Sequence, residues 1–377
     1  MSNNYDVIVI GLGGMGSAAA AHLAKRGQRV LGLDRYPPVH DQGSSHGRTR
    51  IIRKAYYEAP EYVPLVQRAE ILWRELEEET GRALLTITGG LGIGAAEGGF
   101  VTGTLRSARM HHLPHELLDA DAAMARFPAF RLPPDLVAVY EPEAGFLDPE
   151  GCVAAHLEVA ARHGAMLQHE EAVRHWKLDG DGVRVETARG AYAAARLVIT
   201  PGPWAAEVLA DLSLPLEVER IVNVHFEPDQ ADRFSADRCP IYYWELPQGQ
   251  YYGFPALPGQ GLKFGAHLAG EICTPATIRR TVDAEEVEAL RTDLNQFLPG
   301  AAGAVKWTLT CMYTLTPDRH FIIDRHPLHP QVAIACGFSG HGFKFCSAVG
   351  EALADLALSG ATTQQIGFLS AKRFGAV

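Results

Sequence analysis

The 377-residue sequence lacks the apolar segments of a membrane-spanning or secreted protein. Its longest apolar stretches are interrupted by Arg, Asp or Pro before they reach the roughly 18–20 residues that a membrane span requires. The N-terminal segment, Met1 to Asp6, has no basic residue, and the apolar run behind it is too short and too rich in glycine for a signal peptide. We therefore expect a soluble, cytoplasmic protein with no membrane partner.

Cysteine and positive charge are also in short supply. The six cysteines are scattered without a C-x-x-C pair, so the sequence predicts neither a disulfide framework nor a zinc site. The run His111 to His115 contains Pro114, which disfavours the helix that zinc ligands spaced at i,i+4 need, and we expect a solvated loop there. Lys and Arg number 34 against 44 Asp and Glu, and the net charge of −10 argues against a nucleic-acid partner.

What the sequence does contain is a globular composition and a dinucleotide-binding motif. Apolar residues make up 47% of the chain, enough for a sizeable core, and the length predicts two domains or three small ones. An apolar strand over 5–10 runs into the glycine motif 11–16, a helix follows over 17–26, and a strand over 29–33 ends in Asp34. The glycines let a pyrophosphate approach the helix N-terminus, and Asp34 can accept hydrogen bonds from ribose hydroxyls. This spacing does not separate NAD from FAD.

The rest of the chain alternates between two kinds of pattern. Helices are predicted over 61–80, 149–162 and 347–359. Residues 83–140 indicate short strands and loops, 176–185 a hairpin with a DG turn, and 216–306 an antiparallel sheet. We therefore predict the α/β class, with a Rossmann-like domain and a second α+β domain built on an antiparallel sheet, and a chain that crosses between them more than once.

Three further segments carry candidate site residues. A basic stretch follows the dinucleotide unit and contains Arg48, Arg50, Arg53 and Lys54. In an acidic chain such a cluster predicts an anion site, because an arginine fork suits a carboxylate or a charged cofactor ring; surface salt bridges are the alternative. Cys311 follows a strand-like run and by itself is more typical of a buried thiol. The glycine-rich loop 337–344 can turn its N–H groups inward as an anion-binding nest.

With these residues in place, the chain resembles the monomeric sarcosine oxidase family, which includes N-methyltryptophan oxidase. The resemblance covers nearly the whole length and rests on six motifs: Gly11–Gly16, Ser44–Arg53, Tyr251–Pro255, Leu262–His267, Thr310–Asp318 and Gly337–Lys344. It implies a discontinuous FAD-binding domain over residues 1–82, 146–214 and 307–377. The substrate-binding domain is then formed by residues 83–145 and 215–306.

The resemblance also implies the cofactor and the reaction. Members bind FAD covalently through a cysteine thioether to the flavin 8α-methyl carbon, and the matching residue is Cys311. The implied activity is oxidation of N-methyl or other secondary amino acids such as sarcosine. The C–N bond is oxidised to an imine that hydrolyses to an aldehyde and an amino acid, and O2 is reduced to H2O2. We expect a monomer whose substrate is a secondary amine with a carboxylate.

Roles for individual residues follow from matching positions. Arg53 and Lys344 match the pair that binds the substrate carboxylate, Arg50 matches the cation over the flavin ring, and Lys263 matches the lysine that activates O2. Pocket residues that orient the amine or line the substrate site are Tyr252, His267 and Tyr243. The cofactor contacts implied besides Cys311, Arg50 and Lys344 are Gly11, Gly13, Gly14, Gly16, Asp34, Arg35, Ser44, Thr49, Val173, Gly202, Trp204, Tyr313, Gly337, Gly340, His341 and Gly342.

Some features leave the substrate open. The loop before the basic stretch has a single histidine, His46, where members that prefer sarcosine often have a pair, and the aromatic run 242–244 precedes the Tyr251–Pro255 motif. A bulkier or cyclic amine, such as N-methyltryptophan, an imino acid or a fructosyl amino acid, is the closest alternative. An NAD-dependent dehydrogenase would share the first motif but has no use for Cys311 or Lys263. A non-catalytic flavoprotein could dispense with Lys263, Arg53 or Lys344, all of which are present.

Overall fold

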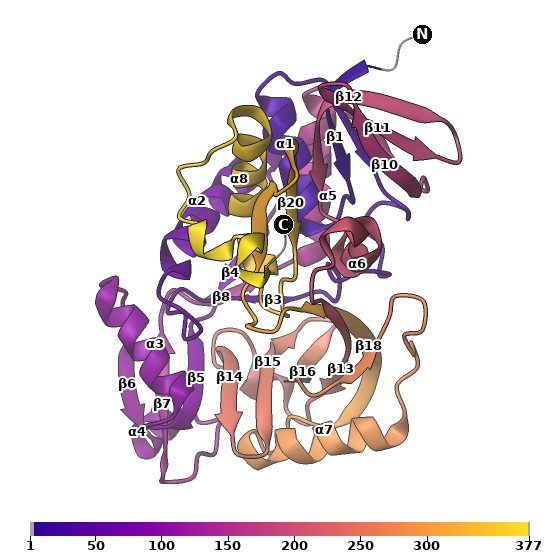
Figure 1. Ribbon diagram of the computed structural model, residues 1–377. Coiled ribbons are helices and arrows are strands. Elements are labelled where there is room, and N and C mark those ends of the chain that lie inside the picture. The colour runs from indigo at the N-terminus through magenta and orange to yellow at the C-terminus, as the bar shows by residue number, and fades with distance from the viewer. Residues whose placement is uncertain (1–3, 376–377) are drawn as a thin grey trace.

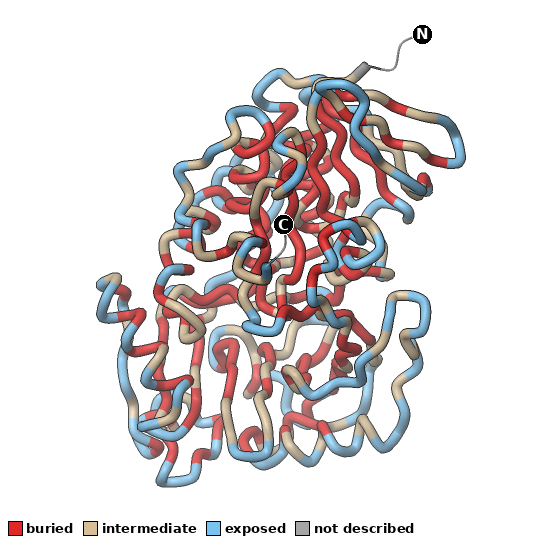
Figure 2. Tube along the Cα trace, in the orientation of Figure 1, coloured by how far each residue is buried: buried red, intermediate tan, exposed pale blue. Residues whose placement is uncertain are grey.

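Two large β-sheets organise the chain, and each packs against helices through its own hydrophobic core (Figure 1). The computed structural model describes residues 4–375. The central strands of both sheets are buried, whereas the outer helices and connections alternate buried and exposed residues (Figure 2). The predicted fold class, an α/β dinucleotide-binding region combined with a second region on a largely antiparallel sheet, is confirmed.

The first sheet has eight strands, with parallel pairing at its centre. Its order runs β10-β11-β12-β1-β2-β9, and β20 pairs with β12 and with β19. The strands are β1 (Asn4–Ile10), β2 (Val30–Leu33), β9 (Met166–Gln168), β10 (Val173–Asp179), β11 (Gly182–Thr187), β12 (Ala191–Ile199), β19 (Ile322–His326) and β20 (His329–Cys336). The hairpin predicted around the DG turn is β10–β11.

Strand β1 is apolar throughout because both of its faces are covered. Val7 and Val9 belong to the core beneath four helices, whereas Ile8 and Ile10 belong to the core on the opposite side, which includes Ala205 of α6 (Ala205–Val208). The four helices are α1 (Gly14–Lys25), α2 (Tyr62–Thr80), α5 (Pro149–Arg162) and α8 (Cys346–Ser359). A continuous apolar run is the pattern of such a doubly covered parallel strand.

The second sheet has nine strands and is antiparallel except between β14 and β5. Its order is β17-β13-β16-β15-β14-β5-β7-β6, and β18 pairs with β13. The strands are β5 (Gly90–Ala95), β6 (Glu116–Asp119), β7 (Leu136–Glu141), β13 (Glu217–Glu227), β14 (Ile241–Leu246), β15 (Gly249–Leu257), β16 (Gly261–His267), β17 (Glu271–Cys273) and β18 (Ala304–Leu315). A third, small sheet contains β3 (Arg50–Ile52), β4 (Leu85–Ile87) and β8 (Gly145–Leu147).

Three helices lie where the sequence predicts only strands and loops, so the prediction is wrong at α3 (Gly99–Met110), α4 (Ala120–Arg126) and α7 (Ala284–Phe297). Helix α3 contains Gly103 and β-branched residues of low helix propensity, and it forms because Phe100 and Leu105 are buried against the second sheet. Helix α7 carries a recognisable signal, a capping box between Asp283 and Glu286.

The predicted domain boundaries remain a prediction, and strand pairing bears on one of them. Strand β18, which carries Cys311, pairs along its length with β13 of the second sheet, whereas the boundary at 307 groups it with the first.

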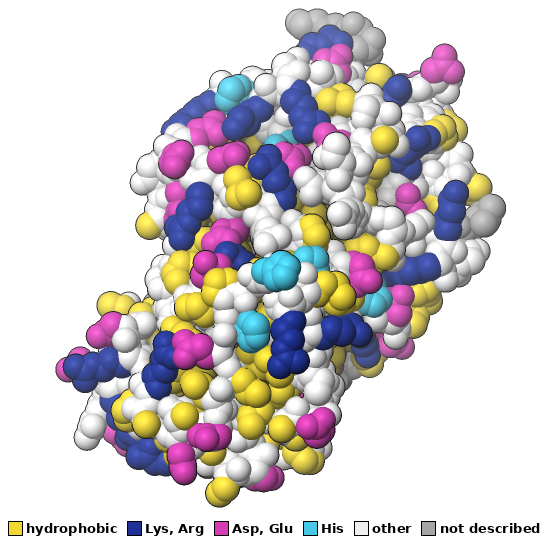
Figure 3. Space-filling model, turned by 90° about the vertical axis from the view of Figure 1, so that its left-hand side faces the viewer, with side chains coloured by type: hydrophobic (Ala, Val, Ile, Leu, Met, Phe, Trp, Pro, Cys, Tyr) yellow, Lys and Arg dark blue, Asp and Glu magenta, His cyan; other side chains and the backbone are white. Residues whose placement is uncertain are grey.

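On the face drawn in Figure 3, Lys and Arg are interspersed with Asp and Glu rather than gathered in one patch. None of the helices in the described part of the chain combines the length and the apolar character needed to cross a membrane.

Candidate cofactor and substrate site

A cleft of about 1410 Å³, including its open mouth, lies where the carboxyl ends of β1 and β2 approach β18. Ligands of open α/β sheets bind at this edge of the sheet. The cleft brings together most of the predicted cofactor contacts: Gly11, Gly13, Gly14, Asp34, Arg35, Ser44, Arg50, Val173, Gly202, Trp204, Cys311, Tyr313, Gly337, Gly340 and Gly342. Segments distant in the sequence therefore form one wall.

The glycine motif forms one end of this cleft. Gly11 has a φ of +84°, which only glycine adopts readily, and a Cβ at Gly16 would collide with the carbonyl oxygen of Gly11. Gly13 differs, because the nearest protein atom to a Cβ there would be Ser45 Oγ at 3.4 Å. The missing side chain leaves space at the N-terminus of α1, where the Gly14 N–H donates to Ser45 Oγ at 3.0 Å. The free N–H groups of this turn can donate to a phosphate.

Asp34 stands directly after β2 with its carboxylate held by the backbone. Its Oδ2 accepts from the Leu12 N–H at 2.7 Å, and its Oδ1 accepts from the Tyr36 N–H at 2.9 Å. Burial opposes ionisation, but hydrogen bonding from His40 and from these two backbone groups lowers the pKa of Asp34. The ionised carboxylate keeps lone pairs that can accept from a ribose.

Cys311 projects from β18 beside the guanidinium of Arg50. The Cys311 Sγ lies 3.6 Å from Nη2 of Arg50, and that nitrogen also donates to the Ser44 carbonyl at 3.0 Å. Nη1 of Arg50 donates to the Thr49 carbonyl at 2.8 Å. Within residues 4–375, Arg50 has no carboxylate at ion-pair distance. A half-buried cation whose hydrogen-bond partners are neutral retains its charge for an incoming anion.

Lys263 lies next to this arginine but belongs to the second sheet. It projects from β16, is 2% exposed, and donates to the carbonyl oxygens of Gly47 at 2.8 Å and Thr49 at 3.1 Å. Burial, and after it the charge of Arg50, lowers the pKa of Lys263 well below its usual value. A negative charge that develops nearby would raise this pKa again.

Arg53 does not point a free guanidinium at the substrate site, because Glu58 occupies it. Nη2 of Arg53 lies 3.0 Å from both carboxylate oxygens of Glu58, and Nη1 donates to the Ala55 carbonyl at 2.9 Å. Both side chains of the ion pair are buried, at 9% and 13% exposure. Glu58 is not among the residues predicted from the sequence. The only signal was an acidic residue five positions after Arg53.

Lys344 is buried near Arg53 and is held by the loop that carries it. Its Nζ donates to the His341 carbonyl at 2.8 Å and to the Tyr56 hydroxyl at 3.2 Å. Burial, and after it the charge of Arg53, lowers the pKa of Lys344 to about 7. Lys344 is therefore poised between its charged and neutral forms near neutral pH.

The predicted pocket residues lie together and are linked to polar neighbours. His267 Nδ1 lies 3.3 Å from the Tyr313 hydroxyl, and the Tyr252 hydroxyl donates to Asn223 Oδ1 at 2.7 Å. Burial lowers the pKa of His267 to about 3, so its imidazole is neutral. The ring of Tyr243 lies 5.9 Å from that of His267. Asn223 carries no signal in the sequence and was missed.

Four of the predicted cofactor contacts do not border the cleft: Gly16, Thr49, His341 and Lys344. Gly16 supports the turn from behind, and Thr49 contributes its carbonyl to the two cations. His341 faces away from the cleft, since its Nδ1 pairs with the Tyr56 hydroxyl at 2.7 Å and its Nε2 with the Arg319 carbonyl at 2.9 Å. The glycines on either side of His341 form the wall instead.

Comparisons with known proteins fit this site. A family model for FAD dependent oxidoreductases matches residues 6–356. The monomeric sarcosine oxidase of Streptomyces avermitilis is 50% identical over 381 positions, covering 100% of this chain and 99% of that protein. The N-methyl-L-tryptophan oxidase of Salmonella agona is 38% identical over 94% of this chain and 95% of its own length. NikD, an amino acid oxidase of nikkomycin biosynthesis, superimposes with a TM-score of 0.84 at 28% identity over 98% of each chain.

Proposed function

The chain belongs to the FAD-dependent oxidoreductase family and is an FAD-dependent amine oxidase, and we propose that its substrate is an N-methyl amino acid such as sarcosine. The resemblance inferred from the sequence motifs is confirmed. The proposed reaction oxidises the C–N bond to an imine, which hydrolyses to an aldehyde and an amino acid, while O2 is reduced to H2O2. The family excludes the NAD-dependent alternative.

One observation carries this proposal: the glycine turn, the Asp34 carboxylate, and the paired Cys311 and Arg50 border a single cleft. These residues fit FAD. The N-terminus of α1 suits the pyrophosphate, Asp34 the adenosine ribose, and the cation of Arg50 the electron-rich flavin ring. Bound there, FAD supplies the two-electron oxidation of the amine and the transfer of electrons to O2.

We propose that Cys311 attaches the cofactor covalently. Its thiol belongs to the cleft wall, and the Arg50 guanidinium beside it can stabilise a thiolate. The other cysteine that borders the cleft, Cys346, makes no such hydrogen bond with Arg50, and burial raises the pKa of its thiol. Cys311 is therefore the cysteine placed for this bond.

Arg53 and Lys344 are proposed to bind the substrate carboxylate. The arginine offers a planar fork and the lysine a single charge, and both are buried, so a carboxylate placed between them is bound in a low dielectric. The structure adds a condition, because Arg53 must release Glu58 before it can pair with the substrate. Glu58 thus acts as an internal substitute for the substrate carboxylate.

His267 and Tyr252 are proposed to orient the amine, and Lys263 to serve O2. A neutral His267 can accept or donate a hydrogen bond without adding charge. Lys263 and Arg50 share the Thr49 carbonyl, so two cationic groups lie at one place where negative charge develops during O2 reduction. Oxidation of the amine and reduction of O2 then depend on different residues.

The packing beside the carboxylate pair favours a small substrate over the bulkier alternatives. The rings of Tyr57, Phe100 and Tyr243 lie 5.0 to 5.9 Å apart, and the Tyr57 and Tyr243 hydroxyls are 3.0 Å apart. Arg53 stacks on Tyr57 at 4.9 Å. We propose that these packed aromatic side chains leave little room beside Arg53 for a large N-substituent or side chain. The protein is further proposed to act as a cytoplasmic monomer with the two-domain division given above.

A panel of amines with H2O2 detection tests the substrate. We expect sarcosine and other small N-methyl amino acids to give the highest kcat/KM, with N-methyltryptophan, cyclic imino acids and fructosyl amino acids at least about tenfold lower, the equivalent of 1.4 kcal/mol. Higher kcat/KM for N-methyltryptophan would refute the small-substrate proposal. An equal rate with an N-methylamine that lacks the carboxylate would refute the roles of Arg53 and Lys344.

Acid precipitation tests the attachment. A thioether survives unfolding, so the precipitated wild-type chain should remain yellow and the Cys311→Ala chain should release its flavin. Cys346→Ala, which alters another cysteine of the cleft wall, is the matched control and should retain the flavin. Free flavin in the wild-type supernatant, or retention in Cys311→Ala, would show that the attachment is assigned wrongly.

A further inference from the structure

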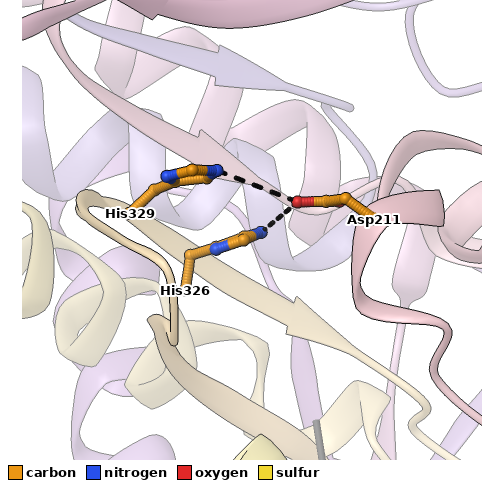
Figure 4. Close-up of side chains that lie close together, drawn as sticks. All are labelled: Asp211, His326 and His329. Atoms are coloured by element: carbon orange, nitrogen blue, oxygen red, sulfur yellow. Dashed lines mark ion pairs between the residues drawn. The ribbon is translucent and has the colours of Figure 1, made fainter. Parts of the chain in front are cut away.

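A cluster of metal-ligating side chains lies outside the cofactor cleft, at the hairpin between β19 and β20 (Figure 4). It contains His326 at the end of β19, His329 at the start of β20, and Asp211 in the 3-10 turn Ala210–Leu212 that follows α6. One ligand atom of each residue lies within 4.8 Å of the other two. Figure 4 shows both imidazoles directed toward one carboxylate oxygen of Asp211.

The atoms are arranged as ligands of one ion rather than as a hydrogen-bonded pair. Nε2 of His326 lies 2.9 Å from Oδ2 of Asp211, and Nε2 of His329 lies 3.9 Å from the same oxygen. The His326 side chain is fully buried, yet its Nε2 has no hydrogen-bond partner, so its N–H direction does not aim at that oxygen. Ligands about 2.0–2.2 Å from a tetrahedral ion lie about 3.3–3.6 Å apart, between the two distances observed.

We propose that Asp211, His326 and His329 bind a divalent transition-metal ion such as Zn²⁺, with water at the fourth position. Two imidazole nitrogens and one carboxylate suit zinc, nickel or copper rather than the oxygen-seeking Mg²⁺ and Ca²⁺. When Nε2 of His326 binds the ion, the imidazole proton lies on Nδ1. Nδ1 then no longer accepts from the Leu328 N–H, and the contact that is lost is a long one of 3.3 Å. Asp211 and His329 are 39% and 25% exposed, so an ion can enter from solvent.

The site would link the turn after α6 to the β19–β20 hairpin of the first sheet. Asp211 follows the segment whose Gly202, Trp204 and Val208 border the cofactor cleft, and the histidines belong to the β19–β20 hairpin. A bound ion would hold the segment that contains Asp211 against the first sheet. We therefore expect a stabilising metal site with no direct part in the oxidation, and we expect Zn²⁺ to raise the melting temperature of the holoenzyme.

Trp176 provides a local reporter of binding. Its ring packs edge-on against both imidazoles, 5.6 Å from His326 and 5.7 Å from His329. A paramagnetic ion such as Cu²⁺ bound between the histidines should quench the fluorescence of this tryptophan. Trp176→Phe should remove most of the metal-dependent quenching without removing the binding itself.

The experiment titrates Zn²⁺ into holoenzyme that carries no polyhistidine tag and has been treated with a chelator. We expect one equivalent to bind, His329→Ala and Asp211→Asn each to weaken binding at least about tenfold, and His175→Ala to bind as the wild type does. His175 is a matched control, because it is an exposed histidine next to Trp176 in the sequence and on the opposite face of β10.

Zn²⁺ binding that is unchanged in His329→Ala and Asp211→Asn would overturn the proposal, as would loss of the equivalent in His175→Ala. A stoichiometry near zero in the wild type would also overturn it. Flavin absorbance of each variant shows that the chain is folded, so a weakened affinity in a flavin-loaded variant reports the loss of a ligand.

Discussion

The pH dependence of carboxylate binding follows from the burial of Lys344. Its pKa lies at about 7, and only the protonated form can pair with a carboxylate. The dissociation constant for a carboxylate should therefore scale with 1 + 10^(pH − pKa). This factor rises about tenfold between pH 6 and 8 and about a hundredfold between pH 6 and 9. The sign follows from the lysine, because raising the pH through 7 removes the charge that binds the ligand.

Two histidines and Glu58 near the pair do not titrate in this range. Burial holds the pKa of His267 at about 3 and that of His341 at about 4, so both stay neutral. Burial raises the pKa of Glu58, but the charges of Arg53, His341 and Lys344 together outweigh it and hold that pKa below its usual value, so the carboxylate stays ionised. Burial also raises the pKa of Glu141, so a Lys344→Met variant decides whether a transition near pH 7 belongs to Lys344 or to Glu141.

Calorimetric titration of the holoenzyme with a short carboxylate that contains no amine measures the effect. At pH 8, about 0.9 proton should be taken up for each ligand bound, against about 0.1 at pH 6, and buffers of different ionisation heat give this number. Lys344→Met should bind weakly with no pH dependence, whereas Lys263→Met should keep the wild-type dependence. A wild-type dissociation constant that changes less than about twofold from pH 6 to 9 would refute the reasoning.

Three further outcomes are expected. Glu58→Gln should free Arg53 and tighten carboxylate binding about tenfold at pH 6, and it should move the Lys344 transition to lower pH because Glu58 raises that pKa; unchanged affinity would contradict the competition. In stopped-flow absorbance, Lys263→Met should slow reoxidation by O2 much more than anaerobic reduction by the amine, and the reverse pattern would move Lys263 to the substrate site. Gly16→Ala should lower the melting temperature and flavin content, since overpacking costs about 1–3 kcal/mol or more, whereas Gly99→Ala, whose Cβ would meet no atom within 4 Å, should not.

The dinucleotide unit could be predicted from local sequence because all of its determinants lie within a short stretch of chain. The strand, the turn, the helix and Asp34 follow each other without interruption, and each obeys its own local rule. Helix α3 could not be predicted in the same way, since burial of one face against the second sheet offsets a modest propensity, whereas α7 has a local signal in its capping box that was overlooked. Local reasoning fails where tertiary packing decides the structure.

Contacts between distant segments also lay beyond local reasoning. Arg50 and Cys311 are 261 positions apart, and nothing in either segment alone indicates that they meet. Their association could be expected only from the family resemblance. Glu58 was missed for a different reason, because the salt-bridge alternative for the basic stretch named no partner, and the counter-ion of Arg53 lies just beyond that stretch.

The charge pattern of the site depends on how one loop presents its carbonyl groups. Gly47 and Arg48 adopt positive φ values of 101° and 70°, and for Arg48 this conformation costs about 1 kcal/mol or more. Glu150 of α5 offsets that cost by accepting from both backbone N–H groups, at 2.7 Å from Gly47 and 3.0 Å from Arg48. With its N–H groups turned to Glu150, the loop directs the Gly47 carbonyl to Lys263. The Glu150 carboxylate is thereby hydrogen-bonded to the backbone. The positive charge of the site stays available to the anion that the reaction creates.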